Sequence, residues 1–225
     1  AHELFHHLKR KTGNKGLMAI KLDMENAFDQ VEWEFLFVVM KNLGFNSKWI
    51  TLVNECITTV SFSILINGSP RGFFKSQRGI RQCDPISPFL FILVTEALSR
   101  MLLKAEAQQK LEGVQISRNS PTVSHLLFAD DTIIFSKATT KNAQSISECL
   151  AKYQSWSGQR INLSKSSMFI TRNTSQTAKA SISHWLPNKT ASARMKYLGL
   201  PTSFNRRKKE NYNDMLTNVG KKLEG

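Results

Sequence analysis

Two adjacent aspartates interrupt an otherwise apolar stretch, residues 125–135, and they restrict the fold of this chain more than any other feature. The stretch reads HLLFADDTIIF, with β-prone residues on both sides of Asp130 and Asp131. This pattern predicts strands over 123–127 and 132–136, with the aspartates at the tip of the hairpin that joins them. Buried carboxylates need a partner or a metal, and adjacent carboxylates repel each other. The tip is therefore either a plain exposed turn or a cation site.

A third carboxylate ends a second apolar run. Residues 17–24 read LMAIKLDM, which predicts a buried strand that finishes near Asp23. Carboxylates that converge from different strands can hold two divalent ions for phosphoryl transfer. Mg²⁺ suits such a site because it prefers oxygen ligands and keeps positions open for phosphates. The structural alternative is that Asp23 is an ordinary strand-end residue.

The charge balance points to a polyanionic partner. The 225 residues contain 31 Lys and Arg against 17 Asp and Glu, a formal net charge of +14. Such proteins often bind nucleic acid because contacts to phosphates release counterions, although a basic surface can also be merely solvated. The three cysteines (Cys56, Cys83 and Cys149) form no paired metal-ligand spacing. The longest apolar run, 89–94, is too short to span a membrane, so no membrane partner is expected.

The remaining segments predict an α+β fold with an antiparallel sheet, because helices alternate irregularly with hairpins. Apolar spacing predicts helices over 2–10, 32–43, 87–109 and 142–156, and one capped by Ser47. Further strands are predicted over 61–66, 71–77, 114–117, 167–171 and 196–200. Asn67-Gly68 marks the turn of a hairpin between the first two of these strands.

Five motifs occur in the order in which a known family carries them. They are KLDMENAFD (21–29), RGIRQCDPISP (78–88), FADD (128–131), SGQRINLSKS (157–166) and KYLGLP (196–201). The chain resembles the reverse transcriptase of non-LTR, LINE-type retrotransposons, close to the plant type, over nearly its whole length. The resemblance implies a polymerase palm with an antiparallel sheet packed on helices and partial fingers. Residues 1–202 would form this domain, and 203–225 the start of a thumb or connection, or a basic tail.

The resemblance also implies the chemistry. The chain would be an RNA-directed DNA polymerase that transfers a nucleotide to a primer 3′-hydroxyl. Two Mg²⁺ ions, with Mn²⁺ as an alternative, would be held by Asp23, Asp130, Asp131 and the Met24 carbonyl. Lys165 would face the leaving pyrophosphate as a general acid, with a plain solvent-exposed lysine as the alternative.

Other residues match the family's substrate contacts. Phe28 matches an aromatic steric gate against a 2′-hydroxyl, and its alternative role is a core phenylalanine. Arg81 and Gln82 match nucleotide and template contacts. The residues that match the hairpin gripping the primer are Tyr197, Leu198 and Gly199.

The resemblance further implies the partners. They would be an RNA template, a DNA primer and dNTPs. A full-length element would add an endonuclease and an RNase H or zinc-knuckle region, and the amino-terminal fingers motifs do not fit in the short segment before Asp23. The nucleus is the location expected from the family.

One position departs from the family pattern. Cys83 stands where the motif Arg-Gln-Gly-Asp-Pro has glycine, and glycine permits positive φ and close backbone approach. This substitution keeps a second hypothesis open, a catalytically decayed retroelement fragment that only binds nucleic acid. A third, a small metal-dependent nuclease, leaves the contexts of Gln82, Phe28 and Tyr197 unexplained.

Overall fold

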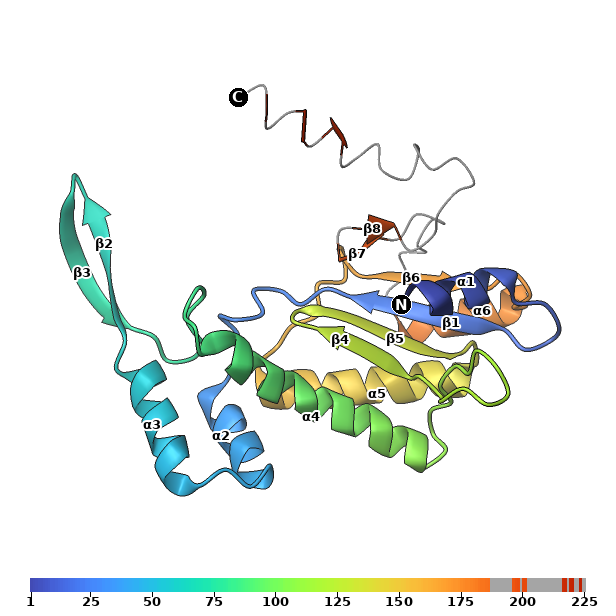
Figure 1. Cartoon of the computed structure of the whole chain (residues 1–225), viewed down its shortest axis with the longest axis horizontal. Coiled ribbons are helices and arrows are strands. Elements are labelled where there is room, and N and C mark those ends of the chain that lie inside the picture. Colours follow the sequence, from blue (N-terminus) through green and yellow to red (C-terminus); the bar gives the residue numbers. More distant parts are fainter. Residues whose placement is uncertain (187–195, 199, 202–215, 218, 221–222, 224–225) are drawn as a thin grey trace.

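The computed structural model has an α+β architecture built on a four-stranded antiparallel sheet of strand order β4-β5-β1-β6 (Figure 1). It describes residues 1–186, 196–198, 200–201, 216–217, 219–220 and 223. The sheet strands are β1 (Leu17–Leu22), β4 (His125–Phe128), β5 (Asp131–Lys137) and β6 (Ser167–Ile170). The helices are α1 (His2–Arg10), α2 (Trp33–Asn42), α3 (Ser47–Thr58), α4 (Ser87–Ala107), α5 (Thr140–Ser157) and α6 (Gln176–Trp185). The predicted fold class is confirmed.

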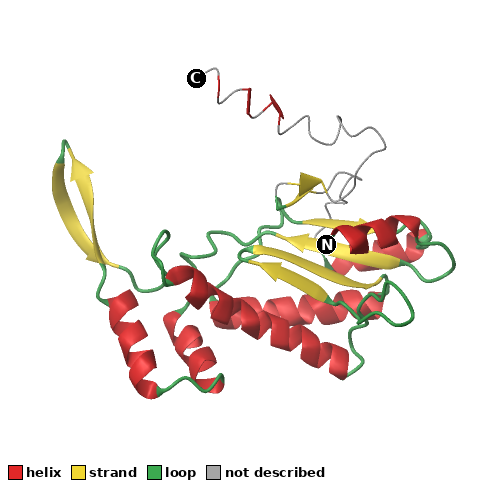
Figure 2. Cartoon of the chain, in the orientation of Figure 1, coloured by secondary structure: helices red, strands yellow, loops and turns green. Residues whose placement is uncertain are grey.

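The sheet separates two apolar clusters because β1 is buried on both faces. Met18, Ile20 and Leu22 join a large cluster with residues of α2, α3, α4, α5 and α6. Leu17 and Ala19 face the other way and pack with α1 in a smaller cluster. Side chains alternate along a strand, so Lys21 shares the face of Leu17 and Ala19. Figure 2 shows α4 and α5 lying together along one side of the sheet.

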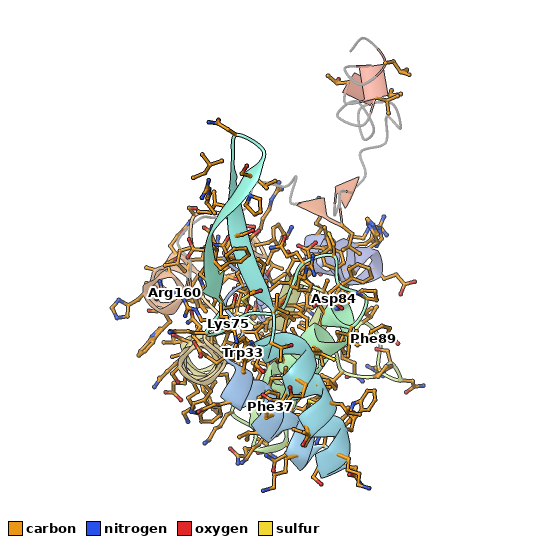
Figure 3. All side chains as sticks on the ribbon, turned by 90° about the vertical axis from the view of Figure 1, so that its left-hand side faces the viewer. Trp33, Phe37, Lys75, Asp84, Phe89 and Arg160 are labelled. Carbon is orange, nitrogen blue, oxygen red and sulfur yellow. The ribbon has the colours of Figure 1, made fainter. Side chains whose placement is uncertain are left out.

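A second, two-stranded sheet stands out from this body. Strands β2 (Ser61–Ile66) and β3 (Ser69–Lys75) pair antiparallel around the turn at Asn67-Gly68, and every residue of both strands is exposed. Figure 3 looks at the molecule from this side and shows the hairpin rising above α2 and α3. The predicted Asn-Gly hairpin is confirmed.

Most predicted helices are confirmed with small shifts at their ends. The longest, predicted over 87–109, ends at Ala107 and has proline in its first turn. The helix predicted over 142–156 begins at Thr140, where the Thr139 side chain accepts a hydrogen bond from the Asn142 amide. Gly158 ends it with φ 75°, a left-handed conformation that commonly ends helices.

Four details of the prediction were wrong. Asn46, not Ser47, caps α3, because its side chain accepts a hydrogen bond from the Lys48 amide. The predicted strand 114–117 is reduced to one isolated bridge between Val114 and Val123. Helix α6 was missed, since it buries only Ile182 and so has little apolar periodicity.

The fourth error is that the predicted strand 196–200 is a hairpin of two short strands, β7 (Lys196–Tyr197) and β8 (Leu200–Pro201). Gly199 and most of 203–225 lie outside the described residues. Among the helices that the structure describes, none is long and apolar enough to cross a membrane.

Candidate active site

Pairing between β1 and β5 brings two of the predicted catalytic aspartates to neighbouring positions. Leu22 lies opposite Thr132 in this antiparallel pair. Continuing the register by one residue places Asp23 opposite Asp131, the first residue of β5. Directly opposed positions on neighbouring strands have Cβ atoms roughly 4.5–5.5 Å apart. The two residues, distant in sequence, therefore lie at the same end of the sheet.

Asp130 lies in the turn between β4 and β5, as the sequence predicted. Phe128 pairs with Asp131, so Ala129 and Asp130 form the tip. Ala129 has φ 50°, which a non-glycine residue rarely adopts. Asp130 is exposed, whereas Asp23 and Asp131 are half-buried. The turn thus presents one carboxylate to solvent beside the two strand-end carboxylates.

The segment that contains Lys165 is bonded to the backbone of Asp23. The Asp23 amide donates to the Ser166 hydroxyl over 3.1 Å, and its carbonyl accepts from the Asn162 amide over 2.8 Å. Met24 forms an isolated bridge with Ile161. The two hydrogen bonds of this bridge are accepted by the carbonyls of Asp23 and Arg160. Neither of them uses the Met24 carbonyl. Lys165 itself is exposed and directly precedes the Ser166 that bonds Asp23.

A lysine already compensates one of the carboxylates. The Lys21 ammonium lies 3.0 Å from Asp131 Oδ1, with both side chains partly buried. Carboxylate oxygens are the ligands that Mg²⁺ and Mn²⁺ accept, so the donor chemistry fits a divalent cation. Within the described part of the chain, however, no three His, Cys, Asp or Glu side chains gather closely enough to hold a metal ion. The donors are present, but they are not assembled around one point.

Phe28, five residues after Asp23, is held by contacts with α4 and with the segment 78–87. Its ring stacks on Phe91 of α4, with centroids 4.9 Å apart and planes at 16°. Its carbonyl accepts a hydrogen bond from the Ile80 amide over 2.9 Å. Phe28 is half-buried while Phe91 is buried. One face of the Phe28 ring is therefore packed against Phe91. This packing fits both alternatives, a steric gate and a core residue.

Arg81 and Gln82 line a cleft of ≈ 450 Å³ at the base of the β2–β3 hairpin. Its lining combines apolar side chains, among them Ile57 and Phe62, with the charged groups of Arg78 and Asp84. None of the three aspartates discussed above belongs to this lining. Figure 3 places Asp84 to one side of the hairpin, with Phe89. The two predicted nucleotide contacts therefore lie together in a cleft that is separate from those aspartates.

Cys83 adopts a backbone conformation that suits glycine. Its φ is 67°, and the Asp84 amide approaches the Arg81 carbonyl over 3.5 Å to close the turn around Gln82 and Cys83. Turns whose third residue has positive φ normally place glycine there. The cysteine side chain is exposed. The backbone at this position thus has the positive φ that glycine permits, and the cysteine is strained.

Tyr197 lies on the same face of the sheet as the acids. It packs with Ile133 and Phe135 of β5, and Asp131 shares their side of that strand by alternation. Burial, and then the nearby Asp131 carboxylate, raise the pKa of the Tyr197 hydroxyl above its usual value. Leu198 is exposed in the turn, with φ 51°. The start of the predicted primer-gripping hairpin therefore lies near the acidic end of the sheet.

Sequence reasoning missed three residues that shape this site. They are Lys21, Ser166 and Phe91. Lys21 could have been noticed in the sequence, because it is the one charged residue within the strand LMAIKL. Ser166 and Phe91 could not have been noticed in this way. Ser166 contacts Asp23, and Phe91 contacts Phe28, only because distant segments of the chain come together.

The sheet with its acidic hairpin turn, the helices behind it and the attached hairpin define the class of polymerase palm domains. A family model described as reverse transcriptase (RNA-dependent DNA polymerase) matches residues 2–202. The chain belongs to this family.

The curated relatives point to mobile elements. An uncharacterized mitochondrial protein of Arabidopsis thaliana is 54% identical over 68 residues, which is 30% of this chain and 56% of that protein. An uncharacterized 149 kDa protein of transposon TX1 from Xenopus laevis is 29% identical over 72% of this chain and 12% of its own length. A Pol polyprotein from the type-1 retrotransposable element R2 of Popillia japonica is 26% identical over 58% of this chain and 21% of its own length. The resemblance to non-LTR retrotransposon enzymes is confirmed, and the chain spans only part of each relative.

Solved structures support the fold. Apo telomerase from Candida tropicalis, truncated from its C-terminal domain, superposes with TM-score 0.59 at 16% identity, over 88% of this chain and 36% of that one. Telomerase from Candida albicans in complex with a fragment of telomeric RNA gives TM-score 0.57 at 13% identity, over 82% of this chain and 29% of that one. At these identities the likeness concerns the fold alone.

Proposed function

We propose that the chain forms the palm and partial fingers of an RNA-directed DNA polymerase that extends a DNA primer on an RNA template. The primer 3′-oxygen attacks the α-phosphorus of a dNTP, the bond to pyrophosphate breaks, and the 3′-hydroxyl proton leaves. The observation that carries the proposal is the β1–β5 register, which sets Asp23 opposite Asp131 on the face that Tyr197 shares. Residues 1–202 would form the domain, and 203–225 the start of a thumb or connection, or a basic tail.

Each proposed residue has a role that its position supports. Two Mg²⁺ ions held by Asp23, Asp130, Asp131 and the Met24 carbonyl would acidify the attacking hydroxyl and neutralise charge on the leaving group. Lys165, exposed beside Asp23, would donate a proton to pyrophosphate.

The substrate contacts follow the same reasoning. Phe28, backed by Phe91, would exclude a 2′-hydroxyl. Arg81 and Gln82 would position the nucleotide and the template from their cleft. The hairpin with Tyr197, Leu198 and Gly199 would hold the primer end. Telomerase in complex with a fragment of telomeric RNA has a similar fold, which supports RNA as the proposed partner.

A second function is favoured by one specific observation. Cys83 has φ 67°, so the turn that carries Gln82 is strained where the family has glycine. We propose as the alternative a decayed fragment that binds RNA–DNA duplex without turnover. Its basic surface would supply the affinity, because the net charge is +14.

Primer extension separates the two functions. The full chain, Cys83→Gly and Asp130→Asn are each given an RNA template, a DNA primer, dNTPs and Mg²⁺. Extension by the unchanged chain and its loss in Asp130→Asn support the polymerase. Extension by Cys83→Gly alone supports the decayed fragment. If neither the chain nor Cys83→Gly extends the primer, the polymerase proposal is wrong for this chain.

Duplex binding provides the control for the second outcome. Affinity for an RNA–DNA duplex is measured over a range of salt concentrations. A steep loss of affinity with salt is expected from phosphate contacts. A flat dependence would contradict both functions, since each needs the basic surface to follow the nucleic-acid backbone.

A further inference from the structure

Lys21 occupies an unusual position for a charged residue. It lies within β1, whose other five residues are buried, and it is half-buried itself. Alternation along the strand puts its side chain on the same face as Asp23, two residues later. Its ammonium reaches across to β5, where it lies 3.0 Å from Asp131 Oδ1.

The arrangement of the acids explains why a cation is needed there. The register sets Asp23 opposite Asp131, and like charges directly opposed on neighbouring strands are destabilising. Side-chain exposure is 19% for Lys21 and 27% for Asp131, so water screens the carboxylate only partly. Among the described residues no acidic cluster is gathered around a metal position. The Lys21 ammonium is therefore a cationic partner of Asp131 at this end of the sheet.

We propose that Lys21 is a built-in counter-ion that competes with divalent cations for Asp131. In the metal-free protein its ammonium compensates the carboxylates. A metal ion that binds through Asp131 competes with it, because the two positive charges repel each other and share one carboxylate. Lys21 thus lowers the affinity of the site for metal while stabilising the protein without it. This inference rests on the proposed function, in which Asp131 binds metal.

The test measures metal binding directly, with no need for activity. Mn²⁺ is titrated into the full chain, and free Mn²⁺ is followed by electron paramagnetic resonance for the unchanged protein, Lys21→Met and Lys21→Arg. The ion pair is a charge-assisted contact at a partly exposed site, so its removal should strengthen Mn²⁺ binding roughly three- to tenfold. Lys21→Arg keeps the competing charge and should bind no more tightly than the unchanged protein.

Lys137→Met is the matched control. Lys137 also lies on this sheet in an ion pair, with Glu112, but opposite Leu17 at the far end of β1. Removing its charge should change Mn²⁺ affinity less than about twofold, since it is more than a Debye length away along the strand. Thermal unfolding gives a second readout, in which Mn²⁺ should raise the melting temperature of Lys21→Met more than that of Lys137→Met.

The outcomes separate this inference from the function on which it rests. If the unchanged protein binds Mn²⁺ and Lys21→Met binds it no more tightly than Lys137→Met, the counter-ion role is wrong and the metal site stands. If Lys21→Arg binds as tightly as Lys21→Met, the effect comes from side-chain shape and the role is also wrong. If neither the unchanged protein nor the Lys21 variants bind Mn²⁺, the metal-binding role of Asp131 fails, and this inference fails with it.

Discussion

Replacing Cys83 by glycine should stabilise the protein. The residue has φ 67°, and a non-glycine residue in this left-handed region costs roughly 1–2 kcal/mol. Glycine removes that cost but loses more freedom on folding, which takes back about 0.5–1 kcal/mol. The thiol side chain is exposed, so little packing is lost. The free energy of unfolding should rise by about 0.5–1 kcal/mol, and the melting temperature by ~1–4 °C for a domain of this size.

Cys83→Ala is the control for this prediction, because alanine removes the sulfur but keeps the Cβ atom that causes the strain. Urea unfolding, followed by circular dichroism, gives the free energy of unfolding for all three proteins. The alanine variant should stay within about 0.5 kcal/mol of the unchanged chain, as exposed substitutions usually do. Should Cys83→Gly prove no more stable than Cys83→Ala, backbone strain at this turn would be the wrong explanation.

Three further predictions follow from the structure. Gly158→Ala should destabilise the protein by about 2 kcal/mol or more in urea unfolding, because the new Cβ would lie 2.4 Å from the Gln30 carbonyl oxygen. The control, Gly68→Ala, has φ 80° and no atom within 4 Å of the new Cβ, so it should lose less stability. Equal losses of stability in the two variants would contradict the clash. Burial lowers the pKa of His125 despite two nearby glutamates. The folded protein therefore gains stability from the neutral imidazole above the unfolded-state pKa of about 6.5, and this stability is lost as the pH falls below that value. The difference in stability between pH 7 and pH 5 should therefore shrink in His125→Gln, and an unchanged difference would refute the burial argument. Phe28→Val should raise incorporation of ribonucleotides relative to deoxynucleotides in primer extension, whereas Phe28→Tyr should not; an unchanged ratio would leave Phe28 as a core residue.

The local features of this fold could be predicted from the sequence because nearby residues determine them. The hairpin at Asn67-Gly68, the proline at the start of α4 and the helix end at Gly158 each depend on the conformational preferences of a few adjacent residues. Helix α6 could not be found in this way, since only Ile182 is buried and the apolar pattern is weak. Its cap, the Ser175 side chain bonded to the Ala178 amide, was the one local sign.

The site was predictable in its parts but not in its assembly. The apolar flanks and the resemblance singled out Asp23 and Asp131, and the pairing of β1 with β5 carries both to the same end of the sheet. The Lys21 partner and the Phe91 support depend on which strands and helices become neighbours. No periodicity within a single segment carries that information.

The central place of β1 in the sheet has a consequence for the order of folding. This strand is made early, yet its two neighbours come late, since Leu22 pairs with Thr132 and Met18 pairs with Ile170. During synthesis this apolar strand must therefore leave the ribosome and remain unpaired until β5 and β6 have followed. Pairings between such distant segments are slow to form and leave hydrophobic surface exposed meanwhile. The face that carries Asp23 and Asp131 is thus completed only after β6 has been translated. Until then, the nascent protein must avoid aggregation through its exposed apolar strand.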